Sequence, residues 1–306
     1  MQFNRREFVT AGAAALVASR LAWGAKDERL PLAFSTLGCP KWELSKILEF
    51  AQANRFAAVE LRGLLGTLDL PSRPEFAPER IAQTKHEIAD HGIKIACVSS
   101  STELHIADQT KRAQGIADGK RFIDLAQALG APNVRVFGNK FEGGTREEVI
   151  ARVAAGMREM AEYAAPRGVT VIIESHGDFV DSPTLKEVLT RATSDHVGLL
   201  WDAHHTFVDG HEQPSRTVAE LGQWIRHTHL KDSVQDGKER KYVLPGKGDV
   251  PMKAQVDALR RIDYQGYYCF EWEKVWHPDL LEPEVAFPDY ARLVTGYLAE
   301  KQASRY

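Results

Sequence analysis

Four short apolar runs in the second half of the chain each end at a side chain that could bind a metal ion. The runs cover residues 169–174, 197–202, 225–230 and 266–271, and the side chains are Glu174, Asp202, His229 and Glu271. Three carboxylates that met around one imidazole would repel one another unless a cation lay between them. A ligand set rich in oxygen suits Mn²⁺, Mg²⁺ or Co²⁺ better than a metal that prefers thiolates, and it does not exclude Zn²⁺. We therefore expect one divalent metal ion, with Mn²⁺ as the first choice.

The residues around these four side chains follow the two-residue period of a strand. A single carboxylate at the end of a strand is more often a helix cap or an exposed loop residue. Alternate side chains of a strand share a face, which places Glu174 with His176, and His229 with His227 and Lys231. The repetition of this pattern on four successive strands is what predicts a site.

These runs belong to a longer alternation of strand and helix patterns. Short β-branched runs predict strands at 32–36, 57–61, 93–99, 133–137, 169–174, 197–202, 225–230 and 266–271. Amphipathic stretches predict helices at 43–54, 78–91, 111–129, 145–167, 182–192, 214–222, 251–261 and 284–301. This α/β alternation is typical of a single (β/α)8 TIM barrel, whose active site lies at the carboxyl ends of the strands. An open doubly wound sheet is disfavoured, because Gly-Lys-Gly at 246–248 lacks the spacing of a phosphate-binding loop.

The composition restricts the class of protein. The 306 residues are 43% hydrophobic and 26% charged, with a formal net charge of −3, which is typical of a globular chain with a large core. The sequence contains no dense block of Lys and Arg, so no nucleic-acid partner is expected. The three cysteines, Cys39, Cys97 and Cys269, are too few and too widely spaced for a disulfide framework or a cysteine-rich zinc site.

The N-terminus resembles a twin-arginine (Tat) export signal. Arg5 and Arg6 precede an apolar, alanine-rich run that is too short to span a bilayer. Gly24 is a small residue of the kind expected next to a cleavage site. The resemblance implies a signal peptide at 1–24, a mature barrel at 25–306, and the Tat translocon as a partner during export. It also implies a periplasmic location without a stable membrane anchor.

Motifs along the predicted barrel resemble the xylose isomerase-like TIM barrel superfamily, in its sugar (phosphate) isomerase/epimerase branch. The motifs lie at 34–42, 58–62, 173–177, 201–205, 227–232, 246–249 and 266–271. Carried over residue by residue, the resemblance implies that the metal ligands are Glu174, Asp202, His229 and Glu271. It also implies substrate contacts at His205, three residues after the metal-binding aspartate, and at His176. The expected substrate is a small carbohydrate.

A site of this kind can remove the proton on the carbon next to a sugar carbonyl. A divalent cation that binds the carbonyl and the adjacent hydroxyl would stabilise the enediolate that develops. Glu174 and Glu271 would form the catalytic pair, one taking the proton while the other returns one. Return to the same carbon gives an epimer, and return to the neighbouring carbon interconverts aldose and ketose.

Further polar residues are expected to contact the substrate. The two histidines at 176 and 205 would hold or polarise its oxygens. Lys231 would either neutralise developing charge or pair with a carboxylate such as Asp232. Glu60 and Arg62, at the end of the second predicted strand, would bind substrate hydroxyls or pair with each other.

The main interpretation is a metal-dependent isomerase or epimerase of an unphosphorylated sugar or sugar derivative, because export disfavours a sugar phosphate. The alternative is a lyase or dehydratase acting on a 3-keto-glycoside, since the same proton removal expels a leaving group from the next carbon. A non-catalytic sugar-binding barrel ranks lower. An abasic-site endonuclease ranks lowest, because Lys-Asp-Ser at 231–233 replaces the Asp-x-His that this branch carries after the seventh strand. The oligomeric state stays open, a homo-oligomer included.

Overall fold

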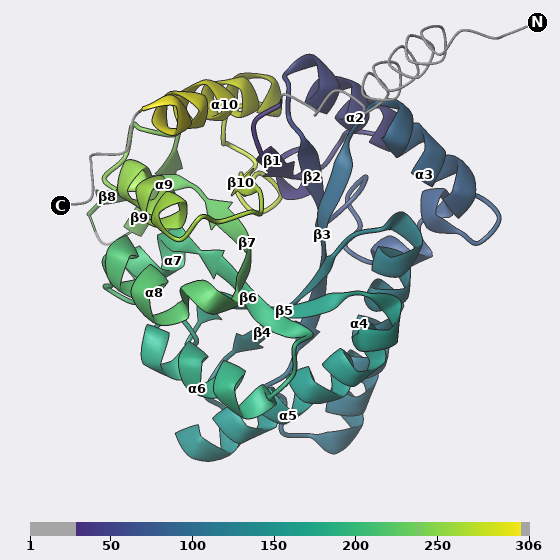
Figure 1. Cartoon of the computed structure of the whole chain (residues 1–306), viewed down its shortest axis with the longest axis vertical. Helices are drawn as coiled ribbons and strands as arrows, with labels where there is room; N and C mark the ends of the chain where they lie inside the picture. The colour runs from purple at the N-terminus through teal and green to yellow at the C-terminus, as the bar shows by residue number, and fades with distance from the viewer. Residues whose placement is uncertain (1–28, 238, 301–306) are drawn as a thin grey trace, which may run out of the picture.

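The computed structural model describes residues 29–237 and 239–300. In this part of the chain, eight parallel strands close into a barrel in the order β1-β10-β7-β6-β5-β4-β3-β2, and the helices lie outside it (Figure 1). The strands are β1 (Leu32–Ser35), β2 (Ala58–Leu61), β3 (Lys94–Glu103), β4 (Asn133–Asn139), β5 (Thr170–Gly177), β6 (Val197–Asp202), β7 (Ile225–Leu230) and β10 (Tyr268–Phe270). The predicted (β/α)8 barrel is confirmed.

The outer helices begin and end where the local sequence favours it. They are α2 (Leu44–Ala53), α3 (Ile81–Asp90), α4 (Gln109–Leu129), α5 (Arg146–Ala164), α6 (Ser182–Ala192), α8 (Pro214–Leu221), α9 (Met252–Arg261) and α10 (Pro283–Ala299). Thr145 and Glu148 form a capping box at the start of α5. Helix α4 ends at Gly130, whose φ of 76° is a left-handed conformation that glycine adopts without strain.

The interior of the barrel changes from apolar to charged toward the carboxyl ends of the strands. One interior cluster consists of small side chains, those of Ala33, Ala58, Ala96 and Cys269. A second cluster consists of Cys97, Ile172 and Leu200. Two residues further along the same inward faces stand Glu174, after Ile172, and Asp202, after Leu200. The apolar clusters therefore form the floor beneath a buried group of charged side chains.

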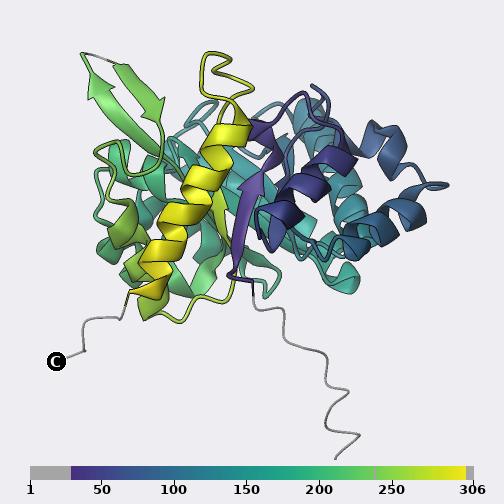
Figure 2. The ribbon, with the colours of Figure 1, turned by 90° about the horizontal axis from the view of Figure 1, so that it is seen from above.

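Two elements at the carboxyl ends of the strands were not expected from the sequence. A short helix, α7 (Ala203–Val208), starts directly after β6, because Asp202 Oδ1 accepts hydrogen bonds from the backbone N–H groups of His204 and His205. Strands β8 (Asp232–Asp236) and β9 (Glu239–Val243) form an antiparallel hairpin, which projects from the barrel in Figure 2. Strand β10 is shorter than the predicted 266–271.

The export signal predicted at 1–24 lies outside the described residues, so it stays a prediction. Among the helices of the described chain, none combines the length and apolar character that crossing a membrane requires. The three cysteines all belong to the described part, and each is buried with a free thiol.

Candidate metal centre

The four predicted metal-binding side chains lie together inside the carboxyl-terminal end of the barrel. They come from β5, β6, β7 and the residue after β10, and their potential ligand atoms all lie within 4.8 Å of one another. Nδ1 of His229 is 3.6 Å from Glu174 Oε1, 3.7 Å from Asp202 Oδ2 and 3.2 Å from Glu271 Oε1. All four side chains are buried. The structure thus brings the predicted set together.

The donor atoms of this cluster fit a small divalent cation. Ligands on opposite sides of an ion bound at about 2.1 Å lie about 4.2 Å apart, close to the observed spread. Within residues 29–237 and 239–300, the buried His229 Nδ1 atom has no hydrogen-bond partner. Buried polar atoms are normally paired. A cation bound among the three carboxylates would accept the lone pair that this nitrogen offers when it is not protonated.

The three carboxyl groups of the cluster are ionised. Burial raises the pKa of Glu174, but Arg135, His229 and His176 together outweigh it and hold that pKa below its usual range. For Asp202, burial is outweighed by the charges of His205 and Lys231, so its pKa also lies well below the ordinary value. The pKa of Glu271 is lowered in the same way, by His229 and Lys231 against the effect of burial. Negative charge is therefore available for a cation at neutral pH.

Arg135 is a member of the cluster that the sequence reasoning missed. It lies on β4, and its Nη1 atom is 2.9 Å from Glu174 Oε2, with both side chains buried. Its guanidinium also lies over the ring of Phe137, 3.9 Å from the centroid. The available signal was a charged residue within an otherwise apolar predicted strand, because such a residue rarely faces a core without a partner.

Lys231 is completely buried and contacts three carboxylates. Its Nζ atom is 2.8 Å from Asp202 Oδ2, 2.5 Å from Glu271 Oε2 and 2.6 Å from Glu273 Oε1. Lys231 thus pairs with carboxylates, as one of the two expectations had it, but its partners are Asp202, Glu271 and Glu273 and not Asp232. Glu273 was also missed by the sequence reasoning, and the hydroxyl of Tyr242, on β9, donates to it at 2.9 Å.

Asp232 instead anchors the loop that returns from the β8–β9 hairpin. Its Oδ2 atom accepts hydrogen bonds from the backbone N–H groups of Gly246 and Gly248, both at 2.8 Å, and its Oδ1 atom accepts one from Val250 at 3.2 Å. Gly248 is required by this close approach, because a Cβ there would lie 2.0 Å from Asp232 Oδ1. The hairpin is therefore closed at its base, directly after Lys231.

His176 and His205 lie beside the cluster, with their ring centroids 5.1 Å apart. His176 Nδ1 is hydrogen-bonded to Asn139 Oδ1 at 2.8 Å, and His205 Nδ1 is 3.0 Å from Asp209 Oδ2. These contacts leave the Nε2 atoms to face other partners; that of His205 is 3.5 Å from Asp202 Oδ2. Burial lowers the pKa of His176. Burial also opposes the charged form of His205, but Asp202, Asp209 and Glu273 together outweigh it and raise that pKa.

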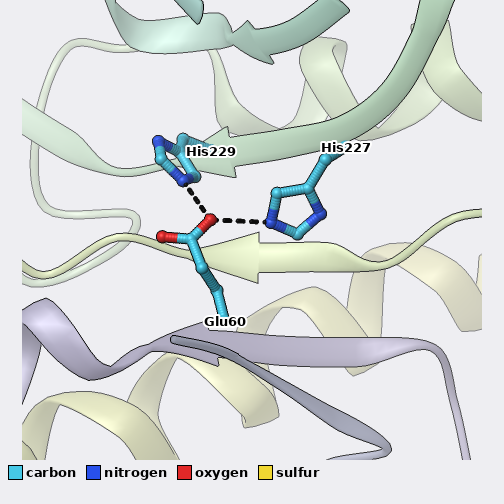
Figure 3. A group of neighbouring side chains, drawn as sticks. All are labelled: Glu60, His227 and His229. Atoms are coloured by element: carbon cyan, nitrogen blue, oxygen red, sulfur yellow. Dashed lines mark hydrogen bonds and ion pairs between the residues drawn. The ribbon is translucent and has the colours of Figure 1, made fainter. Parts of the chain in front are cut away.

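Glu60 and Arg62 do not pair with each other. The Glu60 carboxylate is completely buried and accepts hydrogen bonds from His227 and His229 (Figure 3). It accepts a third hydrogen bond from Ser35. Arg62 is 6% exposed and forms no ion pair with any carboxylate of the described chain. Burial, with the nearby Arg135, lowers the pKa of Arg62 to about 9, so it stays charged at neutral pH. Glu60 thus accepts three hydrogen bonds from protein groups, and substrate contact at either residue stays a prediction.

The chain is similar in sequence and in fold to proteins of known family. The profile of the xylose isomerase-like TIM barrel family matches residues 48–290. The chain is 26% identical to an inosose dehydratase of Glaesserella parasuis serovar 5, over 90% of this chain and 98% of that protein. It is 22% identical to an L-ribulose 3-epimerase of Methylomonas sp., over 64% of this chain and 76% of that protein. Among solved structures, the IolI protein with a bound zinc atom superimposes with a TM-score of 0.74 at 18% identity, covering 88% of this chain and 98% of that one.

Proposed function

Because the chain belongs to the xylose isomerase-like TIM barrel family, we propose that it is a metal-dependent isomerase or epimerase of a sugar or sugar derivative. The observation that carries this proposal is the buried cluster of Glu174, Asp202, Glu271 and His229, whose potential ligand atoms lie within 4.8 Å of one another. A divalent cation bound there supplies Lewis acidity, which makes the hydrogen next to a substrate carbonyl more acidic. Mn²⁺ remains our first choice, and the zinc atom of the IolI structure supports a test of Zn²⁺ beside it.

Glu174 and Glu271 are the proposed acid/base pair. Each carboxylate has one oxygen toward the cluster and the other oxygen paired with a cation, Arg135 for Glu174 and Lys231 for Glu271. These ion pairs fix the two carboxylates on different sides of His229. One carboxylate takes the proton from the substrate carbon. The other, which must first take up a proton from solvent, gives that proton to the opposite face or to the neighbouring carbon, so the two carboxyl groups exchange protonation states. The first outcome is an epimer and the second an isomer.

The remaining polar groups are proposed to hold the substrate. A cavity of about 600 Å³ lies between α7 and the hairpin, lined by His205, Asp209, Tyr242 and neighbouring residues. His205 faces both this cavity and Asp202, so it is placed to contact a substrate oxygen. His176, on β5, and Arg62, directly after β2, provide further donors. The ammonium of Lys231, directly after β7, is engaged by three carboxylates and is proposed to balance their charge. Periplasmic export, if the predicted signal is functional, supports an unphosphorylated substrate.

The test combines metal analysis with solvent isotope exchange. The full-length protein is purified, its metal content is measured by mass spectrometry, and it is incubated in D₂O with free sugars and 3-keto-sugars. We expect about one divalent ion per chain and entry of deuterium at the carbon next to the carbonyl. Glu174→Gln and Glu271→Gln should each lower exchange by about 10²–10⁴-fold. The matched control is Glu284→Gln, at an exposed glutamate on α10. Wild-type exchange in both site variants, or no metal in the active protein, would overturn the proposal.

A dehydratase or lyase is the second candidate, and one observation favours it. The relative matched over 98% of its own length is named an inosose dehydratase. The same proton removal gives elimination when the neighbouring carbon carries a leaving group and an acid protonates that group. His205 is the proposed acid. Its pKa is raised by Asp202, Asp209 and Glu273 against the opposing effect of burial. Substrates that carry such a group, an inosose and a 3-keto-glycoside, separate the two reactions: released water or aglycone identifies the lyase, and a rearranged sugar identifies the isomerase.

A further inference from the structure

We propose that Glu60 is a positioning residue, which fixes the imidazole ring of His229 so that its Nδ1 atom points at the metal-binding carboxylates. This inference rests on the proposed metal site and adds to it a residue that contacts one of the proposed ligands. Glu60 takes no part in the proposed proton transfer, since its carboxylate is completely buried and bonded to protein donors. It acts through His229 alone.

The geometry of the contact supports this role. Glu60 Oε2 lies 2.8 Å from His229 Nε2 (Figure 3), whereas the other ring nitrogen, Nδ1, faces the cluster carboxylates. A carboxylate accepts only, so the hydrogen of this bond belongs to Nε2. When the ring is neutral, Nδ1 then carries the free lone pair, which a metal ion requires. Without an acceptor at Nε2, the ring could rotate or carry its hydrogen on Nδ1 instead.

The Glu60 carboxylate is itself held by two other residues. His227 Nε2 donates to the same Oε2 atom at 2.9 Å, and Ser35 Oγ donates to Oε1 at 2.7 Å. Ser35 is the register partner of Glu60 on β1, whereas His227 and His229 come from β7. A buried carboxylate is costly unless such donors surround it. The three hydrogen bonds therefore fix both the place and the orientation of Glu60 below the cluster.

A second metal ion is the competing explanation of this group. Glu60, His227 and His229 also offer atoms close enough to share an ion. The distances of 2.8 and 2.9 Å between the histidine nitrogens and Oε2 are those of hydrogen bonds. An ion there would need the lone pairs of both Nε2 atoms, whereas in the hydrogen bonds to Oε2 each of these nitrogens carries the hydrogen. We therefore assign the group to the positioning of His229.

The experiment measures zinc affinity in the full-length protein by competition with a chromophoric chelator at one fixed pH. Glu60→Ala should raise the Kd for Zn²⁺ by about 10–100-fold, and Glu60→Gln, which keeps an acceptor oxygen, should raise it less. The control is Glu284→Gln, at an exposed glutamate on α10 that lies outside this group. This control should leave the Kd unchanged. An unchanged Kd in Glu60→Ala, or in Glu60→Gln if the alanine variant does not fold, would overturn the inference.

Proton NMR provides a readout that does not depend on metal. A ring N–H that donates to a buried carboxylate gives a downfield, slowly exchanging signal, and we expect that of His229 to be present in the metal-free wild type. It should persist in Glu60→Gln and disappear in Glu60→Ala, while its persistence in Glu60→Ala would contradict the positioning role. If the wild type binds no metal but shows this signal and its loss, the proposed function fails and the Glu60–His229 contact stands. Two ions per chain, one of them lost on replacement of His227 by leucine, would establish the competing second site.

Discussion

The ammonium group of Lys231 lies 2.8 Å from the carboxylate of Asp202, and both side chains are completely buried. Lys231 thus places a positive charge inside the acidic cluster of the metal-free protein. A buried pair of this kind gives little net stability when compared with apolar residues, but removal of one partner alone is strongly destabilising. The cluster can therefore fold before a metal arrives, and its charge balance depends on this lysine.

Replacement of Lys231 by methionine should lower the free energy of unfolding of the metal-free protein by about 3–5 kcal/mol. The reason is that Asp202, Glu271 and Glu273 would lose their common cation. Urea denaturation in the presence of a chelator measures the effect. Lys241→Met, at an exposed lysine on the hairpin, serves as the control. A loss of less than about 1 kcal/mol would show that the carboxylates are balanced by other means.

Removal of the metal should destabilise the protein. At a free metal concentration one hundred times the Kd, binding adds about 2.7 kcal/mol to the free energy of unfolding, and a chelator should reverse this gain. Thermal unfolding with and without Mn²⁺ or Zn²⁺ measures it. Asp202→Asn should abolish most of the shift, because it removes a carboxylate from the cluster. A metal-dependent shift of equal size in this variant would place the ion elsewhere.

Arg62 should affect substrate binding and leave metal binding unchanged. Its buried guanidinium has no carboxylate partner in the described structure, unlike Arg135. A hydrogen bond to a charged group contributes about 1.5–3 kcal/mol, so Arg62→Leu should lower kcat/KM by about 10–100-fold. Steady-state kinetics, together with the Kd for Zn²⁺, separates the two effects. A weakened Kd for the metal with unchanged KM would assign Arg62 to the cluster instead.

Tyr290 offers a test of stability and its pH dependence away from the site. Its side chain is completely buried, and its hydroxyl has no hydrogen-bond partner among the described residues. Removal of such a hydroxyl avoids a desolvation cost, so Tyr290→Phe should stabilise the protein by about 1 kcal/mol at neutral pH.

The alkaline behaviour of the same variant follows from the pKa of Tyr290, which burial raises well above its ordinary value of 10.0. Above that pH, the unfolded chain releases the tyrosine proton while the folded protein keeps it, so stability falls as the pH rises. Tyr290→Phe removes this contribution, and its stability should fall less steeply. Urea denaturation near neutrality and at about pH 11 measures both effects. Equal slopes in the two proteins would contradict the assignment.

The fold and the four cluster residues could be predicted because both depend on short sequence patterns. Alternation of side chains sets which face Glu174 and His229 share with their neighbours, and parallel strands bring their carboxyl ends to one side of the barrel. The grouping of the four side chains follows from these two rules without any knowledge of side-chain contacts.

The partners of the cluster could not be predicted, because they depend on contacts between distant segments. Arg135 meets Glu174 through the register of β4 and β5. Glu60 meets His229 across the barrel interior, although 169 positions separate them in sequence. Glu273 reaches Lys231 from the irregular segment that follows β10. Each of these contacts needs coordinates, since sequence periodicity says nothing of which charged residues oppose each other.

The anchoring of the hairpin by Asp232 has a consequence for engineering. Because this carboxylate binds backbone N–H groups on both sides of the excursion, at Ser233 and at Gly246–Val250, residues 234–245 form an insertion with a fixed base. A hairpin of another length could be grafted onto that base while Lys231 and His229 keep their places. The hairpin, whose residues line a cavity together with His205, can thus be varied in length without rebuilding the buried cluster of Glu174, Asp202, His229 and Glu271.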